Sequence, residues 1–550
     1  METIRSPILN DEDRLTKLPE SLIHHILSFL DMKYVIHTSL LSRTWRYIWK
    51  SVPTLNFDSD IYDESGDEFN SFIHFIDRVF VFRDRTNVMK FNLVCADEIE
   101  GDLENCLLTW TLALVNCNVR ELSVDIADVS MEVKVPTCLF TCKSLTKLEW
   151  RMGGTYYGDI ELPSVMYLPR LQFLKLDGVN FNDDKLTDRF FSNCPLLESL
   201  TVLDSSIRLN IHSVKLKYLK LDYSRPCFRN GARIVKLYAP NLVTFICKDF
   251  ILKDYTLENL SSLLTADINM RLKVDKYGYG DKNEYEYEYD DDEESEDEDE
   301  DEDESEDEIE DEEEADEDED EDEDENQDDQ DEDEVSDDYY EDDWSEDEDE
   351  DGDGDEDEVE DIKYFTGLSA EKKEPYAKGM MSLLGALRNV IYLKLSSSFL
   401  EVLSEAPGLL DSHPHMSLNV QHLKLKTCLS RNCLHSITYL LRNSPLVQSL
   451  CIVLKRKAFS SESDREDWDA ESSPSCELQN LKLVDIQCIQ GQENELNFLK
   501  FLLKNGVVLE KVVLSSSASK EGKLVEFNEK LVTFPRASLG VQVFPTNLSR

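Results

Sequence analysis

The sequence lacks any long hydrophobic run. No stretch of its 550 residues approaches about 18 uninterrupted apolar residues, roughly the length of a membrane-spanning helix. No charged amino-terminal region precedes an apolar run, as it would in a secretory signal. We therefore expect an intracellular protein, nuclear or cytoplasmic, that has no membrane partner.

The cysteines lack the spacing of a metal site. There are 13, an odd number, and they are scattered along the chain. The closest pairs, Cys138 with Cys142 and Cys428 with Cys433, have no second pair or histidines at the separations that zinc sites use. Reduced and mostly buried thiols are the simpler interpretation.

Catalytic motifs are also missing. The sequence contains no phosphate-binding glycine loop, no Gly-x-Ser-x-Gly elbow and no His-Glu-x-x-His. The two histidine groups, His24-His25 and His413-Pro414-His415, have no acidic or cysteine partner at ligand spacing. We therefore expect a non-catalytic protein with no cofactor and no metal.

Basic residues are absent from one long segment. Residues 290–361 hold 56 of the 117 acidic residues and no lysine or arginine, so the remainder carries 61 acidic against 57 basic residues. This segment repels itself and is too polar to form a core, which predicts a disordered acidic insertion at 276–363. The near-neutral remainder and the polyanion together argue against a nucleic-acid partner.

A functional and a purely structural interpretation of the acidic segment remain open. It could attract a basic protein partner, although a solvated spacer is the simpler reading. A calcium-loop pattern is present from Asp347, Asp349 and Asp351 through Gly352 to Glu358. Such a tract matches the acidic positions in nearly any register, and the flanking amphipathic helices are missing, so we attribute the pattern to chance.

The most informative segment is Leu15–Trp49. Leu18-Pro19-Glu20 opens a helix in which Pro19 occupies a first-turn position. Lys33–Leu40 predicts a second short amphipathic helix, and Ser42–Trp49 a third one capped by Ser42. The first helix is apolar over more than one face, with Ile23, Ile26, Leu27 and Leu30 at helical spacing and Leu22 and Phe29 widening the stripe. A unit of about 40 residues without disulfides or metal usually needs a partner, so we expect a docking module.

Arg14–Ile23, Ile26–Leu30 and Leu41–Trp49 resemble the F-box of plant F-box proteins in order, spacing and residue type. The resemblance implies a Skp-type adaptor as partner and, through it, a cullin scaffold for ubiquitin transfer. Met32 and His37 depart from residues common in the family but remove no apolar anchor. The alternative is an ordinary helical cap on the next domain. The residues implied in adaptor binding are Leu18, Pro19, Leu22, Ile23, Ile26, Leu27, Leu30, Leu41 and Trp45.

Beyond this module, a short pattern with apolar residues at its first, fourth and sixth positions, here called a triplet, recurs along the chain. Most steps between triplets are 26 to 31 residues, and an alternating strand pattern follows each start. A proline two residues before the first apolar residue recurs in four units, as in Pro169-Arg170-Leu171. The triplets start at Val88, Val119, Leu145, Leu171, Leu197, Leu216, Leu242, Val390, Val420, Val447, Leu478 and Leu509.

Repeats of this kind are typical of leucine-rich solenoids, in which stacked units form one continuous core. A sheet of about twelve strands suits an unknown protein substrate better than a metabolite. Leu162–Leu171 and Ser192–Leu200 resemble the repeats that follow plant F-boxes. The alternative is a compact α/β domain whose strands are evenly spaced by coincidence.

The carboxyl-terminal segment resembles the FBD domain found at the end of many plant F-box proteins with leucine-rich repeats. Cys476–Leu483 predicts a strand, Glu493–Lys504 an amphipathic helix that stops at Gly506, and Val507–Leu514 a further strand. Phe534–Ser538 closes the pattern.

These observations predict an α/β protein in which a three-helix F-box precedes an irregular leucine-rich-repeat solenoid. The expected divisions are a tail at 1–10, the F-box at 11–56, repeats at 57–275, the acidic insertion at 276–363, further repeats at 364–470 and the FBD domain at 471–550. The resemblance implies the substrate-recognition subunit of a Skp-cullin-F-box ubiquitin ligase. The alternative is a non-ligase interaction or chaperone-like protein that binds basic clients through its acidic tract.

Overall fold

The computed structural model describes most of the chain on either side of the acidic segment. The described residues are 18–62, 68–96, 103–127, 134–154, 158–181, 183–205, 207–223, 235–251, 255–272, 365, 369–412, 416–427, 429, 431–455, 478–516 and 521–544. The predicted disorder of 276–363, the calcium-type pattern, Cys428 and His413–His415 lie outside these ranges.

Short helices begin the described chain. They are α1 (Glu20–Leu27), α2 (Met32–His37), the 3₁₀ turn η1 (Thr38–Leu40) and the 3₁₀ helix η2 (Trp45–Lys50). Helix α1 starts after Pro19, one residue later than expected. The third helix was expected to be amphipathic and α-helical, but it is a 3₁₀ helix. Its Trp45 N–H donates to Ser42 Oγ at 3.4 Å, so Ser42 does stabilise the start of this turn.

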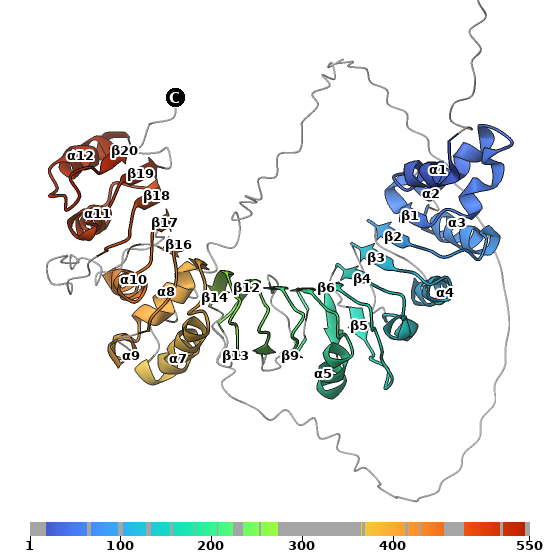
Figure 1. The fold of residues 1–550 in the computed structure, drawn as a ribbon, viewed down its shortest axis with the longest axis horizontal. Helices are drawn as coiled ribbons and strands as arrows, with labels where there is room; N and C mark the ends of the chain where they lie inside the picture. Colours follow the sequence, from blue (N-terminus) through green and yellow to red (C-terminus); the bar gives the residue numbers. More distant parts are fainter. Residues whose placement is uncertain are drawn as a thin grey trace, which may run out of the picture. The chain divides into compact units, whose positions relative to one another are not determined.

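Fifteen strands of the described residues form one parallel sheet in which almost every strand pairs with the next one along the chain (Figure 1). Most of these strands place alternate side chains in the core and the others on an open face. The strands are β1 (Thr54–Asp58), β2 (Lys90–Cys95), β3 (Glu121–Ile126), β4 (Lys147–Met152), β6 (Phe173–Asp177), β8 (Ser199–Leu203), β10 (Tyr218–Asp222), β12 (Thr244–Phe250), β14 (Thr265–Arg271), β15 (Tyr392–Leu395), β16 (His422–Thr427), β17 (Ser449–Leu454), β18 (Leu483–Ile489), β19 (Lys511–Ser516) and β20 (Gln542–Phe544).

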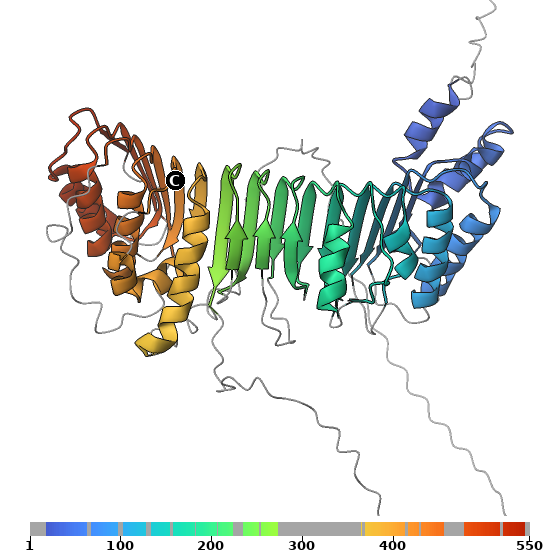
Figure 2. The same cartoon turned by 60° about the horizontal axis from the view of Figure 1, so that its bottom comes forward.

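Helices in the connections cover one face of this sheet (Figure 2). Parallel strands require such crossovers, and the apolar faces of the helices pack on the buried strand positions. The bounds are η3 (Ser59–Tyr62), α3 (Glu68–Phe82), α4 (Leu103–Asn116), η4 (Thr137–Thr141), α5 (Asp184–Ser192), α7 (Ala370–Ala386), α8 (Ser397–Ser404), α9 (Pro407–Ser412), α10 (Arg431–Asn443), α11 (Glu493–Asn505) and α12 (Glu521–Val532).

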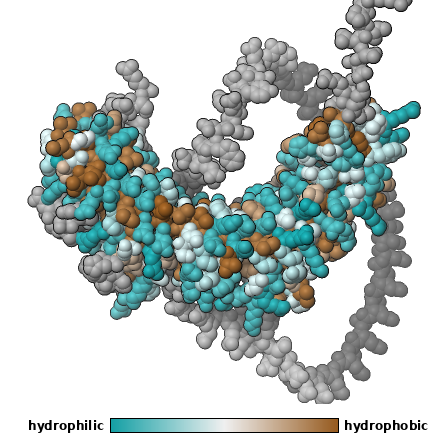
Figure 3. Space-filling view, in the orientation of Figure 1, coloured by the Kyte–Doolittle hydropathy of each residue, from teal (hydrophilic) through white to brown (hydrophobic). Residues whose placement is uncertain are grey.

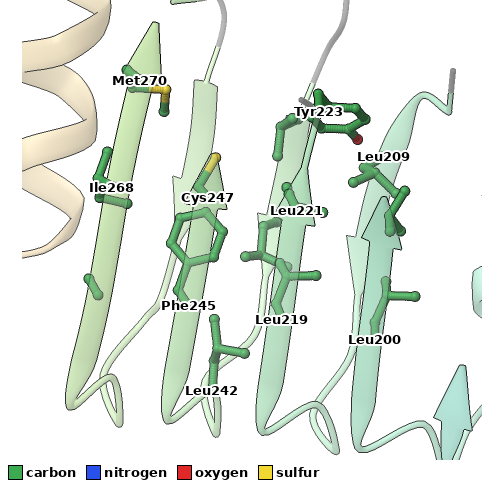
Figure 4. Close-up of a cluster of buried hydrophobic side chains, with 14 of the residues drawn as sticks. Leu200, Leu209, Leu219, Leu221, Tyr223, Leu242, Phe245, Cys247, Ile268 and Met270 are labelled. Atoms are coloured by element: carbon green, nitrogen blue, oxygen red, sulfur yellow. The ribbon is translucent and has the colours of Figure 1, made fainter. Parts of the chain in front are cut away.

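The repeats in the middle of the chain use strands in place of helices. The strands β9 (Leu209–His212), β11 (Val235–Tyr238) and β13 (Tyr255–Glu258) form a second parallel sheet, while β5 (Gly158–Ile160) pairs with β7 (Val179–Phe181). Figure 4 shows how side chains such as Leu219, Phe245 and Ile268 stack from strand to strand in this part of the core. The solenoid is therefore irregular, as the uneven steps between triplets predicted.

The repeat register predicted from the sequence is confirmed at eleven of its twelve starts. All twelve apolar residues are buried, and eleven of them stand two positions before a strand. Leu478 is the exception. Strand β18 begins at Leu483, so the buried residue two positions before it is Leu481 and not Leu478. The strand expected at Cys476–Leu483 therefore starts where it was predicted to end. Helix α11 with Gly506 after it agrees with expectation, whereas β19 begins at Lys511, four residues after the expected start at Val507.

The segment between β14 and β15 is an insertion in the repeat array. Thr265 pairs with Tyr392 and Ile268 with Leu395 in parallel register, although more than 120 residues separate the partners. Ser396 Oγ also accepts from Met270 N–H at 3.0 Å and donates to Met270 O at 2.8 Å. The sheet therefore continues from β14 to β15 as it does between other neighbouring strands, and the expectation of an interrupted solenoid is confirmed.

Candidate docking surface

A buried carboxylate fixes the amino-terminal helices to the first strand. Asp31 caps α2 and accepts from Lys33 N–H at 2.6 Å, from Asp58 N–H at 3.0 Å and from the Tyr62 hydroxyl at 3.0 Å. Burial raises the pKa of Asp31, and these hydrogen bonds oppose part of that shift. Burial, together with the charge of Asp31, also raises the pKa of Tyr62. The arrangement links α2, β1 and η3.

The turn between α1 and α2 is held by a second set of contacts. Asn56 on β1 donates from Nδ2 to Ser28 O at 2.9 Å and to Leu30 O at 3.1 Å. Lys33 donates from Nζ to Ile61 O at 2.7 Å and lies 5.1 Å from the centre of the Tyr62 ring. Because these partners come from the sheet and the segment after it, the backbone of the docking module is positioned by the repeat array.

Three of the residues implied in adaptor binding belong to the core of this module. Ile23, Leu27 and Trp45 are 2 to 5% exposed and pack with Met32 and Val35. Apolar side chains with so little exposure in the free chain stabilise the fold rather than offer surface to a partner. Their burial changes the role that we assign to them.

Another face of α1, together with the turn after it, exposes large apolar side chains. Leu22 is 49% exposed, Ile26 45%, Leu30 37% and Phe29 74%. Figure 3 shows hydrophobic surface over these first helices. The ring of Phe29 packs edge-on against that of His25, with centroids 5.1 Å apart. Pro19 is exposed beside this group and Leu18 is half-buried against the core.

A second exposed apolar group lies at the turns after α2. Leu40 is 85% exposed, Leu41 66% and Tyr47 61%. The cationic groups of Arg46 and Lys50 lie 5.9 Å and 5.6 Å from the centre of the Tyr47 ring. Sequence reasoning singled out Leu41 but missed Leu40 and Tyr47, because helical spacing does not predict which residues a 3₁₀ turn exposes. The exposed pair Leu40-Leu41 next to a break in the helix was the available signal.

Families of known proteins match the chain in three places. An F-box domain model matches residues 15–57, an FBD model residues 469–514, and a model of the leucine-rich repeats of the FBD-associated F-box protein At5g56370 residues 107–261. The F-box/LRR-repeat protein At4g14103 of Arabidopsis thaliana is 32% identical over 266 residues, which cover 47% of this chain and 68% of that protein. The chain belongs to the F-box/LRR-repeat protein family.

Other F-box/LRR-repeat relatives match over the same share of this chain. The F-box/LRR-repeat protein At3g59210 of Arabidopsis thaliana is 34% identical over 277 residues, which cover 48% of this chain and 55% of the relative. The putative F-box/FBD/LRR-repeat protein At3g59240 of the same plant is 30% identical over 272 residues, which cover 48% of this chain and 52% of the relative. The match to these two relatives spans about half their length.

The described residues, those of the F-box included, hold no cluster of three or more histidine, cysteine or acidic side chains able to bind a metal. In the F-box itself, His24 Nε2 lies 3.4 Å from Ser51 Oγ and 3.7 Å from Glu20 Oε1, which is a local contact between the helix and the following turn. No helix in the described ranges is long and apolar enough to cross a bilayer.

Proposed function

We propose that this F-box/LRR-repeat protein is the substrate-recognition subunit of a Skp-cullin-F-box type ubiquitin ligase. Its F-box docks a Skp-type adaptor and, through it, a cullin scaffold, and its repeats bind a protein target. The chain itself is non-catalytic: it holds the target near the ubiquitin-transfer machinery and raises the rate by proximity. It works in the nucleus or cytoplasm.

The exposed apolar face of α1 is the observation that carries this proposal. Contiguous exposed apolar side chains are unfavourable on a soluble surface and mark a site that a partner covers. Leu22 and Ile26, one helical turn apart on α1, form the anchor row for a partner helix or groove, with Phe29 and Leu30 of the following turn beside them. Pro19 and Leu41 also contact the adaptor, and Leu18 does so with its exposed part. Ile23, Leu27 and Trp45 support this surface from below.

The open face of the large sheet is the proposed site for the target. No helix of the described connections packs on it, and its half-buried side chains are mostly polar or charged, as in Glu149, Lys175 and Asp177. Strands about 4.8 Å apart present these side chains in rows that span several strands, which suits an extended protein segment. The division into F-box, repeats and FBD region that we propose is the one expected from the sequence.

Co-expression with a Skp-type adaptor, followed by gel filtration, tests the adaptor step. We expect co-elution at a one-to-one ratio, because burial of the α1 face stabilises the complex. The alternative is a chaperone-like protein that binds basic clients through the acidic segment, which lies outside the described residues. Elution apart from the adaptor, with retention on a column of basic protein, would favour that alternative.

A further inference from the structure

We propose that the open face of β15 and β16 binds an acidic segment of the target protein. This inference rests on the proposed function, since it assigns the chemistry of the target that the repeats hold. The site consists of Lys394, Lys424 and Lys426, next to the rings of Tyr392 and His422.

Like charges stand directly opposite one another at this site. Lys394 on β15 pairs in register with Lys424 on β16, and Lys426 follows two residues further along the same face. Like charges directly opposite one another on neighbouring strands destabilise a sheet. A sheet that keeps such a pair at half-buried positions is therefore suited to an anion supplied by a partner.

The surrounding charges do not neutralise the pair. Lys394 Nζ forms an ion pair with Asp267 Oδ2 on β14 at 2.8 Å. Asp267 therefore compensates the charge of Lys394 and leaves that of Lys424 uncompensated on the β14 side. On the other side, Lys424 is in register with Cys451. Within the described part of the chain no carboxylate forms an ion pair with Lys424. An incoming carboxylate or phosphate would supply the missing charge.

An aromatic pair borders the lysines. The rings of Tyr392 and His422 stack with centroids 4.5 Å apart and planes 7° from parallel. These two residues precede Lys394 and Lys424 by two positions on the same strands, so they share the open face. The site therefore offers a flat surface for an apolar side chain or peptide group beside a place for an anionic one.

The width of the basic surface favours a peptide over nucleic acid. In the row that contains Lys394 and Lys424, Asp267 on β14 and Asp485 on β18 stand on either side. Phosphates of a nucleic-acid backbone that continued across the strands would meet these carboxylates. One or two acidic residues of an extended peptide fit between them.

Fluorescence anisotropy with the full chain tests this assignment. The probes are a labelled peptide with two glutamates beside a leucine, the same peptide with two phosphoserines, its glutamine analogue, and a single-stranded oligonucleotide. Because the chain carries its own acidic segment, each probe is titrated to millimolar concentration. We expect saturable binding of one or both anionic peptides, at least fivefold tighter than the glutamine analogue and weakened by salt. The tighter of the two identifies carboxylate or phosphate as the preferred group.

The decisive variant is Lys424→Glu, with Lys220→Glu as its matched control. Lys220 is half-buried in the equivalent row of β10, has neutral neighbours Thr201 and Ile246, and stands about 19 Å away by strand spacing. We expect Lys424→Glu to weaken anionic peptide binding at least fivefold and Lys220→Glu to leave it within twofold. Equal effects of the two variants, no preference over glutamine, or tighter binding of the oligonucleotide would overturn the assignment. Adaptor co-elution, measured on the same samples, reports separately on the F-box.

Discussion

The Tyr62 hydroxyl donates a hydrogen bond to the carboxylate of Asp31 at 3.0 Å and thereby joins the F-box helices to the first repeat. Asp31 is 7% exposed and also accepts two backbone N–H groups, so removal of its side chain leaves donors without a partner. The orientation of the F-box on the sheet depends on this residue.

We therefore expect Asp31→Ala to destabilise the F-box by about 1 to 3 kcal/mol, as the loss of a capping residue with buried partners does. Tyr62→Phe should lower the stability of the F-box by about 1 kcal/mol, because only the hydrogen bond from the Tyr62 hydroxyl is lost. Hydrogen exchange followed by mass spectrometry on peptides from α1 and α2 measures the change. Unchanged protection in Asp31→Ala would show that this carboxylate does not hold the module.

The pH dependence at Asp31 has a defined sign. Burial raises its folded-state pKa above the unfolded value, so the folded chain binds the proton more tightly than the unfolded chain. Stability should therefore fall as pH rises from the unfolded pKa through the raised folded pKa. In Asp31→Asn, which does not titrate, this part of the pH dependence should be missing. Parallel stability profiles of the two proteins would contradict the raised pKa.

Buried thiols provide a test of the core. Burial raises the pKa of Cys95 and of Cys194 to about 12, whereas Cys488 is half-buried. Thiolate is the reactive form, so at pH 8 the native chain should be alkylated at Cys488 well before Cys95 or Cys194. Peptide mapping after timed iodoacetamide treatment gives the order. Equal labelling in denaturant is the control, and early native labelling of Cys95 or Cys194 would argue against the packing around that residue.

Sequence periodicity predicted the array well, for a physical reason. Each repeat must bury an apolar residue two positions before its strand, and residues such as Val119, Leu145 and Leu216 do so at near-zero exposure. Strand β14 was missed because its repeat has the small residue Ala266 at position four of the apolar pattern. The other repeats have a larger apolar side chain at that position. β1 was missed because Val52 lies at the end of the F-box pattern.

The docking surface was harder to predict than the solenoid. Helical spacing predicts that Ile23, Ile26, Leu27 and Leu30 form one stripe, but it shows neither where the core ends nor that the helix stops at Leu27. The structure buries Ile23 and Leu27 and exposes Ile26 and Leu30. That division depends on contacts with Met32, Val35 and the first strand, which are specified by the tertiary fold rather than by the period.

The insertion should be dispensable for the sheet. β14 and β15 pair in register on both sides of it, so replacement of residues 276–363 by a linker of about 20 glycine and serine residues should preserve the fold. A shorter flexible loop lowers the entropy cost of closure, by about 1 kcal/mol for this change in length. Urea denaturation monitored by circular dichroism measures the free energy of unfolding of the two proteins. Strong destabilisation would mean that the segment supports the sheet.

Core and surface residues of α1 should respond differently to substitution. Ile23→Ala removes buried methyl groups and should cost about 2 to 4 kcal/mol of stability. Leu22→Asp and Ile26→Asp, at positions about half exposed, should change stability by less than about 1 kcal/mol. Thermal unfolding measures both. Equal losses would mean that the exposed face is not a free surface.

The central claim is tested most directly by the affinity of the full chain for a Skp-type adaptor. Calorimetry would compare the affinity of the double variant Leu22→Asp/Ile26→Asp with that of the unchanged chain. Val165→Asp is the control, because Val165 is 72% exposed in the repeats. We expect the double variant to lose at least 100-fold in affinity while it remains folded, and the control to bind as the unchanged chain does. Undiminished binding by a folded double variant would contradict the proposal that this face docks the adaptor.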